Sequence, residues 1–216
     1  MHWPAKGHDG RVDQTAFTDD ENWYGGYYEL AIDLGLRNDP GSDVRLSRAL
    51  RTLWSDPHLD GCYLDRWRAT TVQERVPAAL PDPNEPAPLY GIAVLPSGGA
   101  SVCVTHVIRE VGGETEPHDW LDLSLPTGAL ERLDNRVEGF PFADEDDSLV
   151  WRRPIDDWLA SVATVVFAEA GFRVALIGFE VSGSPAAETI SDVPDERWIG
   201  YLVNQGGYPT YFPATR

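Results

Sequence analysis

Short turn segments separate most of the strand-like stretches in this chain, and that spacing limits the kind of sheet it can form. Residues 89–95 and 100–111 both have the pattern of strands, and only the Pro-Ser-Gly-Gly segment at 96–99 lies between them. Strands joined by turns of this length run in opposite directions. A doubly wound parallel fold needs a helix between most strands, and such helices are absent from the pattern.

The first strand shows the clearest alternation. Residues 27–34 alternate large apolar side chains with small or acidic ones, which is the period of two that a strand gives. We therefore expect one face of this strand to be buried and the other, formed by Glu29, Ala31 and Asp33, to be solvated.

The remaining elements follow from the same rules. Apolar residues at helical spacing predict helices at 42–54 and 154–170, the second with Pro154 at its first position and Gly171 at its end. A short helical turn is expected through Leu130 and Leu133. The class is α+β, with a mixed, mainly antiparallel sheet and the two main helices packed on one face. The predicted strands are 27–34, 59–67, 89–95, 100–111, 120–125, 173–181, 197–203 and 208–212.

Composition suggests one domain. The 216 residues are 42% hydrophobic, which suffices for a single large core. Residues 1–23 are polar and are predicted to be an irregular N-terminal arm. Residues 24–216 form the single α+β domain, with a proline-rich loop at 77–88.

Charge is the most unusual feature of the composition. Thirty-five acidic against seventeen basic residues give a net charge of −18 at pH 7. This acidity argues against nucleic acid and against anionic membrane surfaces, and it favours a basic protein partner. There is no apolar run long enough to cross a membrane, and the first eight residues lack the order of a signal peptide. We therefore expect a cytoplasmic protein.

Familiar catalytic and cofactor motifs are missing. The sequence contains no GxGxxG opening a helix, no GxxxxGK[ST], no HExxH and no GxSxG. Cys62 and Cys103 stand alone in apolar stretches, whereas a zinc site needs closely spaced ligand pairs. We therefore expect buried free thiols, no metal and no cofactor.

One neighbourhood combines histidine with acids. His106 and His118 lie near Glu110, Glu114 and Glu116, and Asp119 follows His118 directly. Such residues serve as general bases or metal ligands. An unrecognised, hydrolase-like enzyme would bring His106, His118 and Asp119 together in a cleft between the sheet and the 154–170 helix. The spacing is not diagnostic, and a packed strand histidine beside a solvated turn is the more common explanation of such a pattern.

Two kinds of residue are candidates for binding a partner. Acidic side chains gather in a predicted loop at 140–147, and aromatic side chains occur in glycine-rich segments, where they often supply interface area. Solvated loops and core packing are the alternative explanations. The candidate partner-binding residues are Asp144, Glu145, Asp146, Asp147, Trp23, Tyr24, Tyr208 and Tyr211.

These observations favour a binding protein without catalysis. In size, acidity and class the chain resembles the immunity proteins of bacterial toxin systems, although no motif carries that resemblance. Such a protein would neutralise a basic toxin or enzyme by occluding its active site. Two alternatives stay open: the unrecognised enzyme, and a structural subunit of a homo-oligomer. The oligomeric state is not fixed by the sequence.

Overall fold

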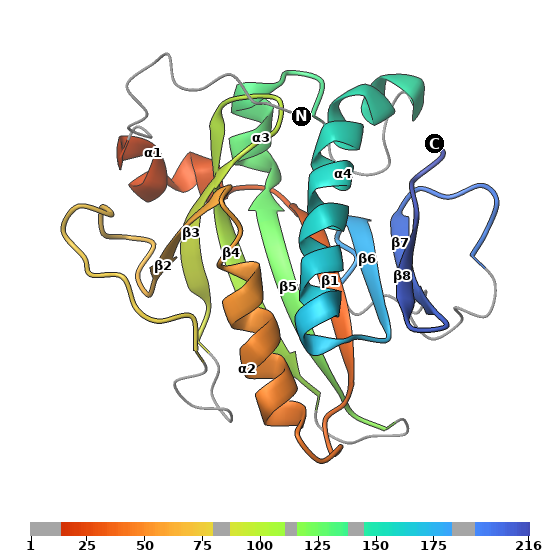
Figure 1. Cartoon of the computed structure of the whole chain (residues 1–216). Helices are drawn as coiled ribbons and strands as arrows, with labels where there is room; N and C mark the ends of the chain where they lie inside the picture. Colours follow the sequence, from red (N-terminus) through yellow and green to blue (C-terminus); the bar gives the residue numbers. More distant parts are fainter. Residues whose placement is uncertain (1–13, 80–86, 111–115, 138–144, 183–192) are drawn as a thin grey trace.

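One antiparallel sheet organises the molecule (Figure 1). The structure is a computed structural model that describes residues 14–79, 87–110, 116–137, 145–182 and 193–216. Within these ranges eight strands pair in the order β2-β3-β4-β5-β1-β6-β7-β8. The strands are β1 (Tyr27–Leu36), β2 (Leu59–Tyr63), β3 (Leu89–Val94), β4 (Ala100–Arg109), β5 (His118–Pro126), β6 (Val174–Phe179), β7 (Gly200–Gln205) and β8 (Tyr208–Phe212).

The helices confirm the predicted class. The two long helices, α2 and α4, lie side by side on one face of the sheet, as Figure 1 shows. The predicted α+β fold with two main helices on one face is therefore confirmed, and all pairings of the described strands are antiparallel. The helices are α1 (Gln14–Thr18), the 3-10 helix η1 (Asp20–Trp23), α2 (Ser42–Leu53), α3 (Thr127–Leu133) and α4 (Glu145–Ala170).

Strand β1 occupies the middle of the sheet. After β1 the chain crosses through α2 to the edge strand β2, and then returns strand by strand to β5, which pairs with β1. Helices α3 and α4 follow, and β6 then pairs with the other side of β1. The central strand is therefore formed early in the sequence and enclosed by strands that come much later.

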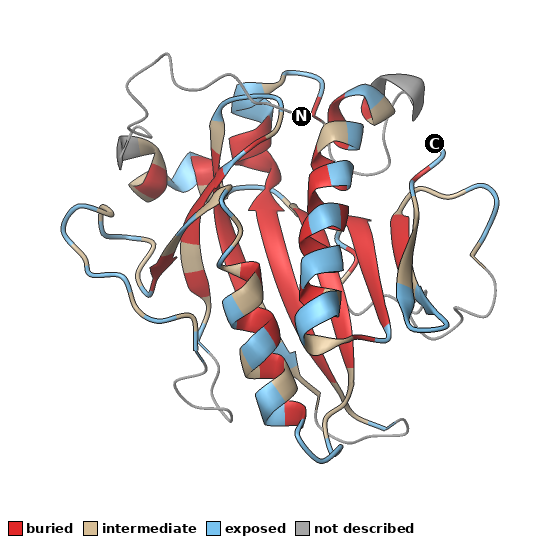
Figure 2. Ribbon diagram, viewed as in Figure 1, coloured by how far each residue is buried: buried red, intermediate tan, exposed pale blue. Residues whose placement is uncertain are grey.

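The main core lies between the sheet and the two long helices. Tyr28, Leu30 and Ile32 of β1 are fully buried against the inward faces of α2 and α4. Figure 2 shows the same division, with buried residues on the strands and the inner helix faces and exposed residues on the outer helix faces. The helical spacing in both helices thus has its expected packing role.

The second face of β1 is not solvated, contrary to the prediction. Glu29, Ala31 and Asp33 are all buried. A second apolar cluster, which includes Ala31, Trp120 and Leu176, covers this face of the sheet. The two acidic side chains are satisfied by polar partners from other parts of the sheet, and for that reason their burial is tolerated.

The predicted irregular arm is helical over its described part. Residues 1–13 lie outside the described residues, but α1 and η1 occupy 14–18 and 20–23. Phe17 is fully buried, with its ring edge-on to both Trp23 and Tyr63. The polar composition concealed this aromatic cluster, which packs on the second face near β2 and β3.

Helix α4 begins nine residues earlier than predicted, at Glu145, and Pro154 lies inside it. The acidic residues from 145 were assigned to a loop, but Trp151 and Ile155 extend the buried stripe toward the N-terminus. Pro154 removes the hydrogen bond to the carbonyl of Val150. Because Val150 is exposed, water can replace that bond. Asp144 lies outside the described residues, as do 80–86 of the proline-rich loop.

The edges of the sheet offer little to another strand. Edge strand β8 contains Pro209, which has no N–H to donate. At the opposite edge, the Val76 N–H donates to the carbonyl of Cys62 in β2 at 2.9 Å, so the chain itself occupies that group. Cys62 and Cys103 are buried free thiols, as predicted, and burial raises the pKa of Cys62 to about 11.

Replacing Trp158 by alanine should destabilise the fold by about 3–5 kcal/mol, because the substitution leaves a cavity in the main core. Trp158 is buried there, and its indole N–H donates to Asp56 Oδ1 at 3.3 Å. Urea unfolding measures the change. The matched control is Val165→Ala on the exposed side of the same helix, which should change stability by less than about 0.5 kcal/mol. Equal effects of the two variants would contradict this packing.

Candidate functional site

The structure does not bring His106, His118 and Asp119 together, although Glu110 lies beside His118 and its Oε2 accepts the backbone N–H of His118 at 2.8 Å. Glu114 lies outside the described residues. His106 lies on the sheet face away from α4, directly opposite Asp122 in the β4–β5 register. His118 contacts Asp33 on that same face, through Nδ1 and Oδ1 at 2.8 Å. Asp119 instead points to the helix side. The prediction that these side chains meet in a cleft between the sheet and α4 is therefore wrong.

Each of these groups has a structural role of its own. Asp33 accepts a hydrogen bond from Arg173 Nε at 2.6 Å as well as contacting His118, which fastens β6 and β5 to β1. Asp119 Oδ1 accepts a hydrogen bond from Arg109 Nε at 2.9 Å. The same guanidinium forms an ion pair with Asp43 of α2, with Nη1 and Oδ1 2.7 Å apart. Removing one partner of such a buried pair would leave an uncompensated charge, so these contacts fix the positions of the elements that they join.

Burial also places two carboxyl groups beside serines on the second face. Ser124 Oγ donates to Glu29 Oε1 at 3.1 Å, and Ser182 Oγ donates to Asp122 Oδ2 at 2.6 Å. Desolvation raises the pKa of Glu29, and it raises the pKa of Asp122 to about 7. Among the described residues, no basic side chain lowers the pKa of either carboxyl group. A proton is therefore the available neutralising partner.

A third carboxyl group with a raised pKa, that of Asp156, lies in the main core. Tyr28 donates its hydroxyl to Asp156 Oδ1, and burial raises the pKa of Asp156 to about 7. One turn earlier, the fully buried Arg152 donates to the carbonyls of Trp198 and Arg216 at 2.8 and 2.6 Å. This cluster ties α4 to β1 and to the C-terminal segment.

The described ranges contain neither a cluster of metal ligands nor a membrane-spanning helix. No three His, Cys, Asp or Glu side chains are grouped there to hold a metal ion. No helix in the same ranges combines the length and apolar content that a membrane span requires.

A hollow on the described surface has an exposed aromatic wall. Tyr24 is 71% exposed, and it lines a shallow hollow of about 530 Å³ together with Glu21, Gly128, Glu131 and Arg132. Gly128 is needed here because a Cβ at that position would lie 2.5 Å from the Glu21 carbonyl oxygen. The N–H of Gly128 donates to the carbonyl of Tyr24 at 3.0 Å, which fixes α3 against the end of η1.

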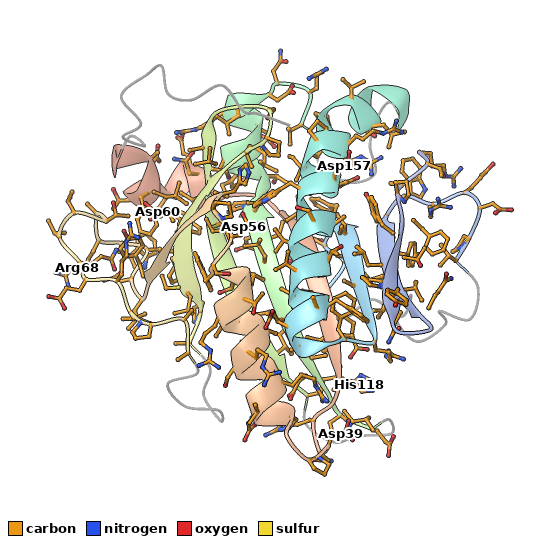
Figure 3. The ribbon with its side chains drawn as sticks, viewed as in Figure 1. Asp39, Asp56, Asp60, Arg68, His118 and Asp157 are labelled. Carbon is orange, nitrogen blue, oxygen red and sulfur yellow. The ribbon has the colours of Figure 1, made fainter. Side chains whose placement is uncertain are left out.

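A projecting loop extends this surface. Trp67 is 60% exposed, and the guanidinium carbon of Arg66 lies 3.6 Å from the centre of one of its rings. Arg66 also contacts Asp20 Oδ1 at 3.4 Å, so the loop joins η1. Figure 3 labels Arg68 on this loop, which projects beyond β2. The η1 surface is defined here as Asp20, Glu21, Tyr24, Arg66, Trp67 and Glu131.

The predicted partner-binding residues fall in different places. Trp23 is half-buried, and its indole N–H donates to the carbonyl of Phe17 at 2.8 Å, whereas its neighbour Tyr24 is exposed. Tyr208 is 77% exposed at the β7–β8 hairpin, and Tyr211 packs partly buried against the main core. The backbone of Glu145, Asp146 and Asp147 belongs to α4, and Asp144 lies outside the described residues.

Sequence reasoning missed Arg66, Trp67 and Glu131 as members of this surface. Residues 59–67 were predicted as one strand, but β2 ends at Tyr63 and leaves Trp67 on a loop. An available signal was the Arg-Trp-Arg triplet at 66–68, because Trp and Arg are the residues that interfaces favour. The contact of Arg66 with Asp20 spans 46 residues and has no local signature.

Comparison with known proteins identifies nothing similar. No family model, curated protein or solved structure matches the chain.

Replacing Asp156 by asparagine should flatten the dependence of stability on pH. Asp156 ionises near its ordinary value of 3.8 when unfolded but near 7 when folded. Its contribution is therefore fully present below about 4 and is lost as pH rises toward 7, at up to about 1.4 kcal/mol per pH unit. Thermal unfolding between these pH values measures the slope. Asp157→Asn, at the adjacent exposed position, should leave the slope unchanged. An unaltered slope in Asp156→Asn would contradict the assignment.

Proposed function

We propose that this chain is a protein-binding domain that engages a basic partner through the η1 surface. One observation carries the proposal: two large aromatic side chains, Tyr24 and Trp67, are exposed beside the acidic residues Asp20, Glu21 and Glu131. Exposed Trp and Tyr commonly become the central contacts of interfaces. The acids supply complementarity to a basic partner.

The net charge supports a basic partner over an acidic one. At −18 the whole chain attracts positively charged proteins over long range and speeds their association. Nucleic acid is the less suitable ligand, because phosphate groups would be repelled by the same field. On the η1 surface Glu21 keeps 82% of its side chain exposed, so a partner can still reach its carboxylate beside the ion pair with Arg132.

The surface is also held in place before any partner arrives. Arg132 donates to Asp19 Oδ2 at 2.9 Å and to Glu21 Oε2 at 2.5 Å, which fixes η1 against α3. In the projecting loop, Asp65 Oδ1 accepts a hydrogen bond from the backbone N–H of Trp67 at 2.8 Å. Gln73 Nε2 donates to the backbone carbonyl of Asp65 at 2.8 Å. Surfaces organised in this way lose little conformational entropy on binding.

In its specific form, the proposal is an immunity-type inhibitor in the cytoplasm of a bacterium. A projecting loop with an exposed indole suits insertion into a cleft, and the neighbouring acids suit the basic residues that surround the active site of many toxins and enzymes. The hydrolase-like enzyme is not carried forward, because His106 and His118 have separate partners. A homo-oligomer built by strand addition is disfavoured by Pro209 at the β8 edge.

The test begins with the partner. The tagged chain is used to capture proteins from the organism that makes it, with a low-salt wash, and the bound protein is then purified and its binding rates measured. We expect a basic protein in stoichiometric amount, released by high salt. The absence of any such protein, with the chain folded and monomeric by light scattering, would overturn the proposal.

Neutralising the acids of the η1 surface should slow association. The triple variant Asp20→Asn, Glu21→Gln, Glu131→Gln should reduce the association rate about tenfold at low salt and flatten its salt dependence, because long-range attraction is weakened. The matched control neutralises three exposed acids elsewhere, with Asp157→Asn, Glu169→Gln and Glu196→Gln. Equal effects of the two triples would show attraction by net charge alone and remove the η1 surface from the interface.

Two further comparisons locate the contact. Trp67→Ala and Tyr24→Ala should each weaken binding by about 2 kcal/mol, mainly through faster dissociation. Neutralising Asp144, Glu145, Asp146 and Asp147 together tests the acidic segment before and at the start of α4. A larger loss there than at the η1 surface would place the interface on α4 instead.

A further inference from the structure

The main core opens to the surface at one end of the sheet. Helix α3, the turn between β3 and β4, and the first half of α4 meet there, at the top of the molecule in Figure 1. A hollow of about 260 Å³ lies between them. Its floor is formed by buried residues of the main core, namely Leu95, Leu130, Val137, Trp151 and Ile155. Its lining shares no described residue with the hollow beside Tyr24.

The rim and the volume of this hollow suit a small aromatic molecule. Leu133 of α3 and Val150 of α4 line the rim, and they are 43% and 55% exposed. An apolar cavity of roughly 150 Å³ holds one benzene molecule, so a hollow of about 260 Å³ has room for two fused rings. Trp151 adds an aromatic wall, which favours a flat ring over an aliphatic group of the same area.

The charged side chains at the hollow neutralise each other. Among the described residues that line it, the charged ones are Asp134 and Arg136. Arg136 Nε donates to Asp134 Oδ1 at 2.9 Å and Nη2 donates to Oδ2 at 2.6 Å, and this pairing lowers the pKa of Asp134. The net charge of −18 also repels anions from the whole surface. A neutral ligand therefore fits this hollow better than a charged one.

A backbone carbonyl gives the hollow a directional polar group. In an α-helix each carbonyl points toward the residue four positions later, whose N–H it accepts. Pro154 lies inside α4 and has no N–H, so the carbonyl of Val150 lacks that donor. Val150 and Pro154 both line the hollow, and the carbonyl that points from one to the other therefore lies at its wall. A ligand N–H or O–H can supply the hydrogen bond that the proline removes.

We propose that this hollow is a binding site for a neutral, fused aromatic molecule with one N–H or O–H donor, for which indole is the simplest probe. The rings pack between α3 and α4 on the floor of core residues, and the donor binds the carbonyl of Val150. No covalent bond is made or broken. The site does not depend on the proposed protein partner, so either proposal can fail without the other.

Methyl NMR of the wild-type chain tests the location of the site. Indole is added to protein labelled at the methyl groups of Leu, Val and Ile. We expect saturable shifts at Leu130, Val137 and Ile155, with a dissociation constant of about 0.1–1 mM for a ligand of this size. The methyl groups of Val165, on the exposed side of the same helix, serve as the internal control and should not shift.

The donor is tested by comparing indole with benzofuran, which has the same shape but an oxygen in place of the N–H. The wild-type chain should bind indole about fivefold more tightly, which is the effect of one hydrogen bond to a carbonyl. Pro154→Ala supplies a backbone N–H to the carbonyl of Val150, so the preference for indole should disappear. Val165→Ala, the matched control on α4, should keep that preference.

Three results would overturn the proposal. The first is the absence of saturable shifts at the floor residues up to the solubility limit of indole, and the second is a set of shifts confined to residues outside the hollow. The third is equal affinity of the wild-type chain for indole and benzofuran. Because all three are measured on the wild-type chain, the test gives an answer even if Pro154→Ala fails to fold.

Discussion

The structure depends on a central strand that is buried on both faces although it carries acidic residues. β1 lies between β5 and β6, with the two long helices on one side and a second apolar cluster on the other. Glu29 and Asp33 are consequently buried, and each needs a partner inside the protein. Those partners come from β5, β6 and the turn after β6, so the polar contacts hold together the segments that the topology brings to β1.

The protein neutralises its buried carboxyl groups in two different ways. Asp33 and Asp119 are paired with arginine, whose charge is permanent. Asp122 and Asp156 lie where burial raises the pKa to about 7, so a proton can neutralise each of them, although Arg152 partly opposes the rise at Asp156. Stability therefore increases on acidification over the range in which these two groups become protonated. An acidic protein with this arrangement is more stable at mildly acidic pH than at neutral pH, as far as these two groups are concerned.

The sequence allowed the strands and α2 to be predicted because their signals are local. Alternation along 27–34 and helical spacing along 42–54 correspond closely to β1 and α2. The failures arose where distant residues decide the outcome: Glu29 and Asp33 look solvated until Ser182 and Arg173 are placed beside them. In the candidate site, Tyr24 was accessible to prediction from its glycine-rich setting. Trp67 was not, because its role depends on where β2 ends and on the contact between Arg66 and Asp20.

The η1 surface and the turn after β6 meet the same short segment, yet hydrogen bonds separate them. Tyr24 lies three residues before Tyr27, whose carbonyl accepts the Glu180 N–H. Between these positions, α3 holds the chain: the Thr127 N–H donates to Gly26 at 2.9 Å, and the Gly128 N–H donates to Tyr24 at 3.0 Å. The turn therefore contacts Tyr27, whereas both hydrogen bonds from α3 act on the residues before it. The position of Tyr24 is therefore set by α3 and η1, and not by the turn after β6.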